Sequence, residues 1–277
     1  LYRDGAPCEL CVGKAFALPG VRHGCYRESP AATLAVATMT ATHRALGTWQ
    51  RAVDRYIAIT DFARGKFVQG GLPEHKLVVK PNPLSYDPGM GENGGGFALF
   101  VGRLGTGKGV EVMLEAWRRE AGLPPLVVVG DGPLAPLVEA AHVDLGDRVQ
   151  WLGWREHDDV IAMMKEAAVM VFPSQVYEGG TPMSIVEAQA CGLPVVASDR
   201  GAMKTMVADG ETGYRFSPTD PDALARAVHL LVHQDHGREA MRHRARTAFT
   251  TTYAPDVNVR RLVAIYHEAL AERRARA

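Results

Sequence analysis

Short runs of mainly apolar residues alternate with longer segments of helical periodicity through the middle of the chain. The apolar runs predict strands at residues 97–101, 126–129, 149–152, 169–172 and 195–197. The segments between them predict helices at residues 110–121, 134–141, 160–167 and 184–190. Short apolar strands separated by amphipathic helices are typical of a parallel sheet covered on both faces. The predicted fold is therefore α/β, a doubly wound, Rossmann-like parallel sheet that binds ligands at the carboxyl ends of its strands.

The segments on either side of this alternation are less regular. Before residue 87 the chain predicts a helix at 29–47, a second helix that starts at Thr60 or Asp61, and strands at 55–60 and 76–80. Residues 87–96 are polar and dense in glycine, which predicts a linker and a domain boundary. Three more helices are predicted toward the C-terminus, at 221–232, 238–248 and 257–276.

Composition narrows the class of protein. The 277 residues carry a formal net charge of zero, so no nucleic-acid partner is expected. No apolar run reaches the roughly 18 residues of a spanning helix, and no signal-peptide pattern opens the chain. Because the sequence begins at Leu1 rather than at a methionine, we expect it to start within a longer protein, with an N-terminal segment missing.

The spacing of the first three cysteines leaves two interpretations open. Cys8, Cys11, His23 and Cys25 have the residue types of a zinc site. The alternative is three reduced thiols in a packed turn, as in a reducing compartment. The fourth cysteine, Cys191, follows an apolar helical segment and is expected to pack in the core.

The most informative stretch runs from residue 172 to residue 198. It predicts the end of a buried strand, a turn with Glu178, a helix with Glu187, and a second buried strand. Between the two carboxylates, Thr181 and Pro182 predict a helix start, with threonine as the N-cap and proline as the first helical residue. Two acids placed around a helix start indicate a ligand that offers hydroxyls as well as negative charge.

The backbone at this helix start predicts an anion site. The N–H groups of Met183, Ser184 and Ile185 would lack acceptors within the helix, and the helix N-terminus favours negative charge. A phosphate bound there, beside two carboxylates, fits a nucleotide sugar.

A glycine-rich loop follows the first strand of this domain, from Gly102 to Gly109. It carries Arg103 and Lys108, and its flexible backbone opens directly into a helix. The two cations and the helix N-terminus are suited to hold a diphosphate.

The same loop also resembles a Walker A sequence, which is a rival interpretation. Gly102, Gly107 and Lys108 match that pattern, but residue 109 is glycine where a P-loop needs serine or threonine to hold Mg²⁺. No later strand ends in a Walker B aspartate, since Asp131 lies in a turn. A P-loop NTPase is therefore the weaker reading.

Two further loops leave their roles open. Gly130 begins a Gly-Asp-Gly-Pro turn, which is either a tight connection or a direct ligand contact. Gly153 and Trp154 follow the third strand, where the backbone can face a nucleotide base and the indole can either stack on it or cover the sheet.

Taken in order, these motifs resemble those of family 4 glycosyltransferases. The resemblance is carried by Gly-Arg-Leu and Lys-Gly at 102–109, Gly-Asp-Gly-Pro at 130–133, Phe-Pro-Ser at 172–174, the segment from Glu178 to Ser198, and Asp209–Phe216. It implies a retaining, metal-independent hexosyl- or glycosyltransferase with two facing Rossmann-like domains, the GT-B architecture. It also implies that residues 1–86 are the remnant of an acceptor-side domain, 97–255 the donor-binding domain, and 256–277 a helix that packs back on the first domain.

The resemblance assigns roles to matching positions. Arg103 and Lys108 would bind the diphosphate of a UDP- or GDP-sugar, Glu178 would contact the transferred sugar, and these three carry catalysis. Glu187 would bind the ribose hydroxyls. The remaining donor-binding positions are Gly102, Gly130, Gly153, Trp154, Gly180, Thr181, Pro182, Met183 and Ser184. No metal and no cofactor is implied, because the leaving phosphate itself takes the acceptor proton.

Two departures from the family pattern affect these expectations. Eight residues separate Glu178 from Glu187 where the family has seven, and the Gly179–Gly180 turn is the expected place for the extra one. The family's first-domain strands and its catalytic-cleft histidine or aspartate have no counterpart in this chain. The alternative function is therefore a non-catalytic module that binds nucleotide sugar.

The last predicted helix bears on partners and location. Arg273, Arg274 and Arg276 either meet an anionic lipid surface or form a solvated C-terminus. A saccharide or lipid-linked acceptor is expected, in the cytoplasm or at the inner face of the membrane.

Overall fold

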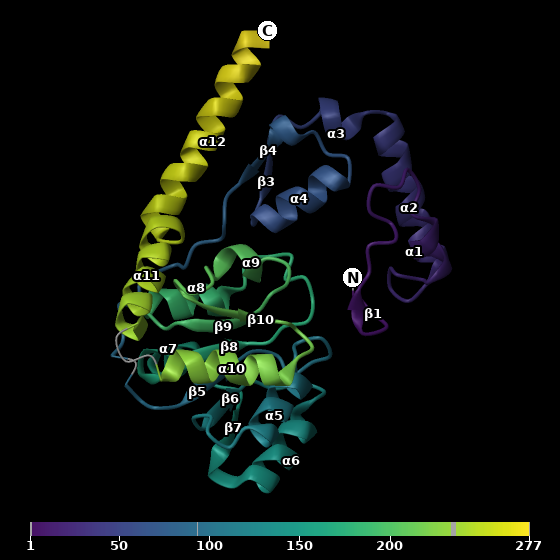
Figure 1. Cartoon of the computed structure of the whole chain (residues 1–277). Coiled ribbons are helices and arrows are strands. Elements are labelled where there is room, and N and C mark those ends of the chain that lie inside the picture. The colour runs from purple at the N-terminus through teal and green to yellow at the C-terminus, as the bar shows by residue number, and fades with distance from the viewer. Residues whose placement is uncertain (1, 93, 234–236, 277) are drawn as a thin grey trace. The chain divides into compact units, whose positions relative to one another are not determined.

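The computed structural model describes residues 2–92, 94–233 and 237–276 (Figure 1). Leu1, Asn93 and Ala277, which belong to the predicted segments, lie outside the described residues. The chain forms two compact units, Asn82–Asn258 and Leu1–Pro81 with Val259–Ala277.

The unit Asn82–Asn258 is built on a six-stranded sheet in the order β10-β9-β8-β5-β6-β7, in which every pairing is parallel. The strands are β5 (Ala98–Val101), β6 (Leu126–Val129), β7 (Val149–Gly153), β8 (Val169–Phe172), β9 (Val195–Ser198) and β10 (Gly213–Phe216). The predicted fold class, α/β with a parallel sheet, is confirmed. The strand β10 was not predicted from the sequence, because its Gly-Tyr-Arg-Phe run is not wholly apolar.

Helices cover both faces of this sheet, as Figure 1 shows. They are α5 (Val110–Arg119), α6 (Ala135–Leu145), α7 (His157–Glu166), α8 (Met183–Ala190), α9 (Met203–Met206), α10 (Pro221–Val232) and α11 (Gly237–Thr252). One core layer packs Trp117 of α5 and Val228 of α10 against the sheet. The other packs Met164 of α7, Ile185 of α8 and Phe249 of α11. Burial on both faces explains why the central strands are apolar throughout.

The glycine-rich segment expected as a linker, 87–96, lies within this unit. Gly91 donates its N–H to the carbonyl of Cys191 at 2.9 Å, and both carboxylate oxygens of Asp87 accept from the Arg246 guanidinium. A Cβ on Gly91 would collide with the backbone of Lys165. The glycine here thus serves close packing against α7.

The other unit holds the N-terminal residues and most of the last helix. Its elements are β1 (Tyr2–Arg3), β2 (Ala6–Pro7), α1 (Leu18–Arg22), α2 (Pro30–Ala45), α3 (Thr48–Arg51), β3 (Tyr56–Ala58), α4 (Asp61–Gln69), β4 (Leu77–Val79) and α12 (Pro255–Arg276), of which the residues from Val259 onward belong here. Ser29 caps α2 and Thr60 caps α4 through side-chain hydrogen bonds to the N–H groups of Ala32 and Ala63. No helix in the described ranges is long and apolar enough to span a bilayer.

The first three cysteines are half-buried thiols. Together with His23 they line a cavity of about 470 Å³, and the Cys11 sulfur accepts the N–H of Gly20 at 3.2 Å. Among the residues the structure describes, no group of three or more Cys, His, Asp or Glu side chains is arranged to hold a metal ion. The zinc interpretation therefore finds no support in the described geometry, and the reduced-thiol interpretation is the one that fits.

Candidate functional site

A cavity of about 190 Å³ opens at the carboxyl ends of β5 and β8. Two loops and one helix start form it: the glycine-rich loop after β5, the loop after β8, and the first residues of α8. The predicted site residues that line it are Gly102, Arg103, Lys108, Glu178, Pro182, Met183 and Ser184. Crossover connections in a parallel sheet bring these separate segments to one edge.

The centre of the cavity is an ion pair between Lys108 and Glu178. Lys108 Nζ lies 2.6 Å from Glu178 Oε1, and the side chains are 34% and 18% exposed, respectively. The Ser174 hydroxyl donates to the same carboxylate oxygen at 2.7 Å. Glu178 is therefore held from two sides, by a cation from the first loop and by a hydroxyl from its own.

Arg103 is the second cation of the cavity. Its side chain is exposed, and no carboxylate within the described ranges pairs with it. An arginine without a protein partner at a cavity mouth can offer its planar donors to an incoming anion.

Gly109 allows the loop after β5 to pack closely against the loop after β8. Its φ is +74°, and a Cβ there would collide with the carbonyl oxygen of Pro173. Next to it, the Gln175 N–H donates to the carbonyl of Gly107 at 2.7 Å. A serine or threonine at position 109 would collide with Pro173 and push the two loops apart. The loop therefore has no room for the hydroxyl with which a P-loop holds Mg²⁺. The P-loop NTPase interpretation does not fit this geometry.

The start of α8 differs from the prediction. Pro182 is the N-cap and Met183 the first helical residue, and no side chain caps the helix. Thr181 is buried, and its hydroxyl oxygen lies 3.5 Å from the backbone N–H of Asn82. The predicted threonine cap is wrong, because the tertiary contact takes the hydroxyl away from the helix.

The same helix start still presents backbone donors to the cavity. The Ile185 N–H, expected to be available, donates instead to the carbonyl of Pro182 at 3.1 Å. Met183 and Ser184 line the cavity, and no acceptor for their N–H groups is found among the described residues. Two such donors at a helix N-terminus favour an anion.

Glu187 lies one helical turn further along α8, outside the residues that line this cavity. Its side chain is 14% exposed, and its Oε1 lies 3.9 Å from His157 Nδ1 at the start of α7. Burial raises the pKa of Glu187, and the neighbouring His157 partly opposes that rise. Tyr86 contacts the His157 ring edge-on with ring centroids 6.1 Å apart. A nearly buried carboxylate whose charged-group neighbour is a histidine nitrogen 3.9 Å away is available for hydroxyl donors of a ligand.

The remaining predicted positions serve in different ways. A Cβ on Gly130, at φ +135°, would collide with the carbonyl oxygen of Gly102, so this glycine allows the first two loops to pack together. Gly153 has a φ of +68° with open space around it, and Trp154 is 65% exposed. Gly180 lies in the turn before α8. Gly130, Gly153, Trp154 and Gly180 are thus not among the residues that line the cavity around Lys108.

Two residues near the carboxylates were not singled out from the sequence. Ser174 closes the Phe-Pro-Ser motif and lies four residues before Glu178, close enough to bond its carboxylate. His157 begins α7 and approaches Glu187 only through the fold. The Phe-Pro-Ser motif could have identified Ser174, whereas no local sequence pattern indicates His157.

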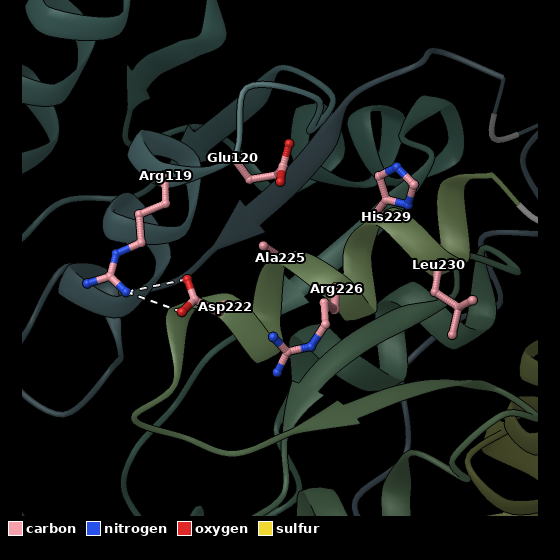
Figure 2. Close-up of a pocket in the computed structure, with 7 residues that line it drawn as sticks. All are labelled: Arg119, Glu120, Asp222, Ala225, Arg226, His229 and Leu230. Carbon is pink, nitrogen blue, oxygen red and sulfur yellow. Dashed lines mark hydrogen bonds and ion pairs between the residues drawn. The ribbon is translucent and has the colours of Figure 1, made fainter.

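A larger cavity, of about 650 Å³, lies between α5 and α10 (Figure 2). Two of its charged groups are exposed and pair with each other, since Arg119 Nη1 lies 3.3 Å from Asp222 Oδ1. It is lined by the surfaces of helices rather than by strand ends. The smaller cavity is therefore the candidate site.

The central part of the chain matches a known protein family. The family model described as "Glycosyl transferases group 1" matches residues 91–248. A D-inositol 3-phosphate glycosyltransferase of Salinispora tropica is 34% identical over 191 residues, which are 64% of this chain and 39% of that protein. An alpha-D-kanosaminyltransferase of Streptomyces kanamyceticus is 31% identical over 61% of this chain and 45% of its own length. The chain spans about two fifths of the length of the curated relatives it matches.

Solved structures share the fold. HepE of Anabaena, in complex with UDP and glucose, superposes with a TM-score of 0.69 at 20% identity, over 82% of this chain and 67% of that one. Sucrose-phosphate synthase of Thermosynechococcus elongatus gives 0.66 at 22% identity, over 78% and 58%. At these identities the likeness shows the fold alone, and it agrees with the predicted α/β fold of the GT-B type. The match of the family model over more than half of the residues, together with the loops that converge on the Lys108 cavity, shows that this chain belongs to the group 1 glycosyl transferases.

Proposed function

We propose that the unit Asn82–Asn258 binds a nucleotide-diphosphate sugar and that the protein transfers the sugar to an acceptor with retention. The observation that carries the proposal is the convergence of Arg103, Lys108 and the start of α8 on one cavity that also contains Glu178. A diphosphate needs positive charge and N–H donors at close range, and a sugar needs a nearby carboxylate. The UDP and glucose bound by HepE support this ligand class.

The residues of the cavity suggest how each part of the donor is held. Arg103 and Lys108 would neutralise the diphosphate, and the N–H groups of Met183 and Ser184 would bind its distal phosphate. Glu187 would accept hydrogen bonds from the ribose, since its nearly buried carboxylate has His157 as a distant neighbour at 3.9 Å. UDP and GDP are both compatible with this arrangement, because none of these groups reads the base.

Catalysis would rest on stabilising the departing diphosphate. Charge develops on the leaving oxygen as the sugar–phosphate bond breaks, and preorganised donors at that position are each worth about 10²–10³ in rate. The leaving phosphate would take the acceptor proton, so no protein nucleophile is required. Two cations and a helix N-terminus supply the charge for this step, and the reaction is accordingly proposed to be metal-independent.

Lys108 would change partners during this cycle. Without ligand it pairs with Glu178 at 2.6 Å, so a bound diphosphate must compete with that carboxylate. Once Lys108 turns to the phosphate, Glu178 is still held by Ser174 and can accept sugar hydroxyls.

A saccharide or lipid-linked acceptor, a cytoplasmic location and a peripheral position at the membrane belong to the same proposal. The second candidate function is binding of the donor without transfer. Measuring sugar transfer to saccharide and to lipid-linked acceptors would distinguish the two functions.

The test is calorimetric titration of the chain with UDP, GDP and ADP, each with EDTA and with Mg²⁺. Binding of one nucleoside diphosphate that is equal in both conditions would support the donor site and identify its base. Binding only with Mg²⁺, or no binding of any of the three, would contradict the proposal, whereas metal-independent binding of ADP alone would replace the expected UDP- or GDP-sugar by an ADP-sugar. Transfer is tested by donor hydrolysis and by product formation with the same nucleotide, where affinity without turnover would favour the binding module.

A further inference from the structure

The loop after β8, which carries Glu178, is also bound to the end of β9. The Ser198 hydroxyl donates a hydrogen bond to the carbonyl of Ser174. Next to it, Arg200 Nη1 donates to the carbonyl of Gln175 at 2.6 Å. Ser174 and Ser198 are 1% and 0% exposed, respectively. A hydrogen bond between groups buried this deeply does not compete with bulk water, so it holds the loop more firmly than a surface contact would.

The course of β8 explains why a side chain makes this contact. Backbone pairing between β8 and β9 ends at Phe172 and Ala197. The next residue of the first strand is Pro173, which has no N–H to donate, and the regular pairing stops there. Ser198 is the first residue of β9 beyond the last pair, and its hydroxyl serves as the donor for the buried carbonyl of Ser174. Without that hydroxyl, a buried acceptor would lose its partner.

The two carboxylate oxygens of Glu178 have different surroundings. Oε1 accepts from the Ser174 hydroxyl at 2.7 Å and lies 2.6 Å from Lys108 Nζ. Within the ranges that the structure describes, no group donates to Oε2. One oxygen is therefore the anchor of the carboxylate, and the other keeps its full capacity to accept hydrogen bonds.

We propose that Ser198 is a positioning residue for Glu178, acting through Ser174. The Ser198 hydroxyl fixes the backbone of Ser174, the Ser174 hydroxyl fixes Oε1, and Oε2 is thereby kept for a hydroxyl of the transferred sugar. This inference rests on the proposed function. It matters most in the donor complex, because Lys108 then turns to the diphosphate and Ser174 is the contact that remains on Oε1.

The test compares a nucleotide with its sugar conjugate, by calorimetric titration of the full chain with UDP and UDP-glucose, or with GDP and GDP-glucose. Ser198→Ala should weaken binding of the sugar nucleotide about tenfold and leave the bare nucleoside diphosphate within about twofold of the parent value. The difference is expected because only the conjugate has a sugar for Glu178 to hold. General damage to the loop would weaken both ligands, since the Gln175 N–H ties this loop to Gly107, beside Lys108.

Three further variants separate positioning from folding. Ser174→Ala should give the same pattern, and the double variant with Ser198→Ala should lose no more than Ser174→Ala alone, because both hydroxyls act through one chain of hydrogen bonds. Ser198→Cys, whose S–H is a weak donor, takes the place of Ser198→Ala should that variant fail to fold. The matched control is Thr212→Val, which removes another buried hydroxyl of the same unit, one that accepts the N–H of Ala208 at 3.0 Å. It should lower thermal stability without changing the ratio of the two affinities.

The outcomes separate this inference from the proposed function. Equal losses for both ligands in Ser198→Ala, or unchanged affinity for the sugar nucleotide, would overturn the positioning role. A parent protein that binds none of these nucleotides would contradict the proposed function instead. Crystal structures of the ligand-free parent and of Ser198→Ala then decide the positioning role: displacement of Glu178 Oε1 from Lys108 Nζ supports it, and an unchanged ion pair overturns it.

Discussion

Replacing Lys108 with alanine tests the candidate site most directly. The ammonium has one observed partner, the Glu178 carboxylate, at 2.6 Å. In the proposed complex it would bind the diphosphate instead. The variant therefore removes a ligand contact, and it also leaves Glu178 without its cation beside the bound phosphates.

The size of the effect follows from an exchange of partners. A hydrogen bond to a charged group contributes about 1.5–3 kcal/mol. The existing pair, with Lys108 about one third exposed, is worth up to about 1 kcal/mol in the free protein and must be given up on binding. The net loss expected for Lys108→Ala is therefore about 0.5–3 kcal/mol, which corresponds to about a two- to 150-fold weaker Kd.

The assay is calorimetric titration with UDP or GDP, whichever binds the parent protein. Lys204→Ala is the matched control, because Lys204 pairs with Asp199 and does not line the cavity. Glu178→Gln should tighten binding of the bare nucleoside diphosphate, since it removes the competing carboxylate. Unchanged affinity in Lys108→Ala, or weaker binding in Glu178→Gln, would refute the exchange of partners.

Three other predictions follow from the same region. Glu187→Gln should weaken the binding of UDP but leave the binding of inorganic pyrophosphate unchanged in titrations, and equal losses for both ligands would contradict ribose binding. Because burial raises the pKa of Glu187, the carboxylate takes up a proton at a higher pH than an exposed glutamate does, so the parent's affinity for UDP should begin to fall at a higher pH as the pH is lowered. Gly109→Ser should lower the free energy of unfolding by about 1–3 kcal/mol or more from strain at positive φ and should not create Mg²⁺-dependent ATP binding, as measured by denaturant unfolding and titration; a stable variant that binds Mg²⁺-ATP would restore the P-loop reading. Cys191 should resist iodoacetamide in the folded protein at pH values near neutrality, because burial raises the pKa of its thiol to about 12, while mass spectrometry finds alkylation at the half-buried Cys8, Cys11 and Cys25; early alkylation of Cys191 would show that α8 opens.

The sheet could be predicted because burial on both faces leaves a strong local signal. The central strands are apolar at every position, and amphipathic helices separate them along the chain, which is typical of a parallel sheet covered on both faces. The edge strand β10 has a half-buried tyrosine and a half-buried arginine, so its sequence lacks the continuous apolar run that predicts a buried strand. The other edge strand, β7, was predicted although only Val149 is fully buried, because three of the four residues from Val149 to Leu152 are apolar.

Helix starts show the limit of local reasoning. Ser29 and Thr60 cap their helices as their positions predict, because each hydroxyl reaches an N–H only three residues away. Thr181 has the same local sequence logic, but its hydroxyl faces the N–H of Asn82, 99 residues away in the chain. Likewise, the glycine-rich segment at 87–96 has the composition of a linker, but the ion pair between Asp87 and Arg246 attaches it to the larger unit. Sequence patterns cannot show such distant partners.

The extra residue between Glu178 and Glu187 illustrates why spacing alone could not fix the site. Each carboxylate is positioned by its own contacts, Glu178 by Lys108 and Ser174, and Glu187 by its place on α8. The turn between them contains Gly179, around which a Cβ would meet open space. An inserted residue there lengthens the turn without moving either anchor. The position of Glu178 is therefore set by the Lys108 loop across the cavity, and it is this contact, rather than the count along the chain, that would place the Glu178 carboxylate beside a sugar in the proposed complex.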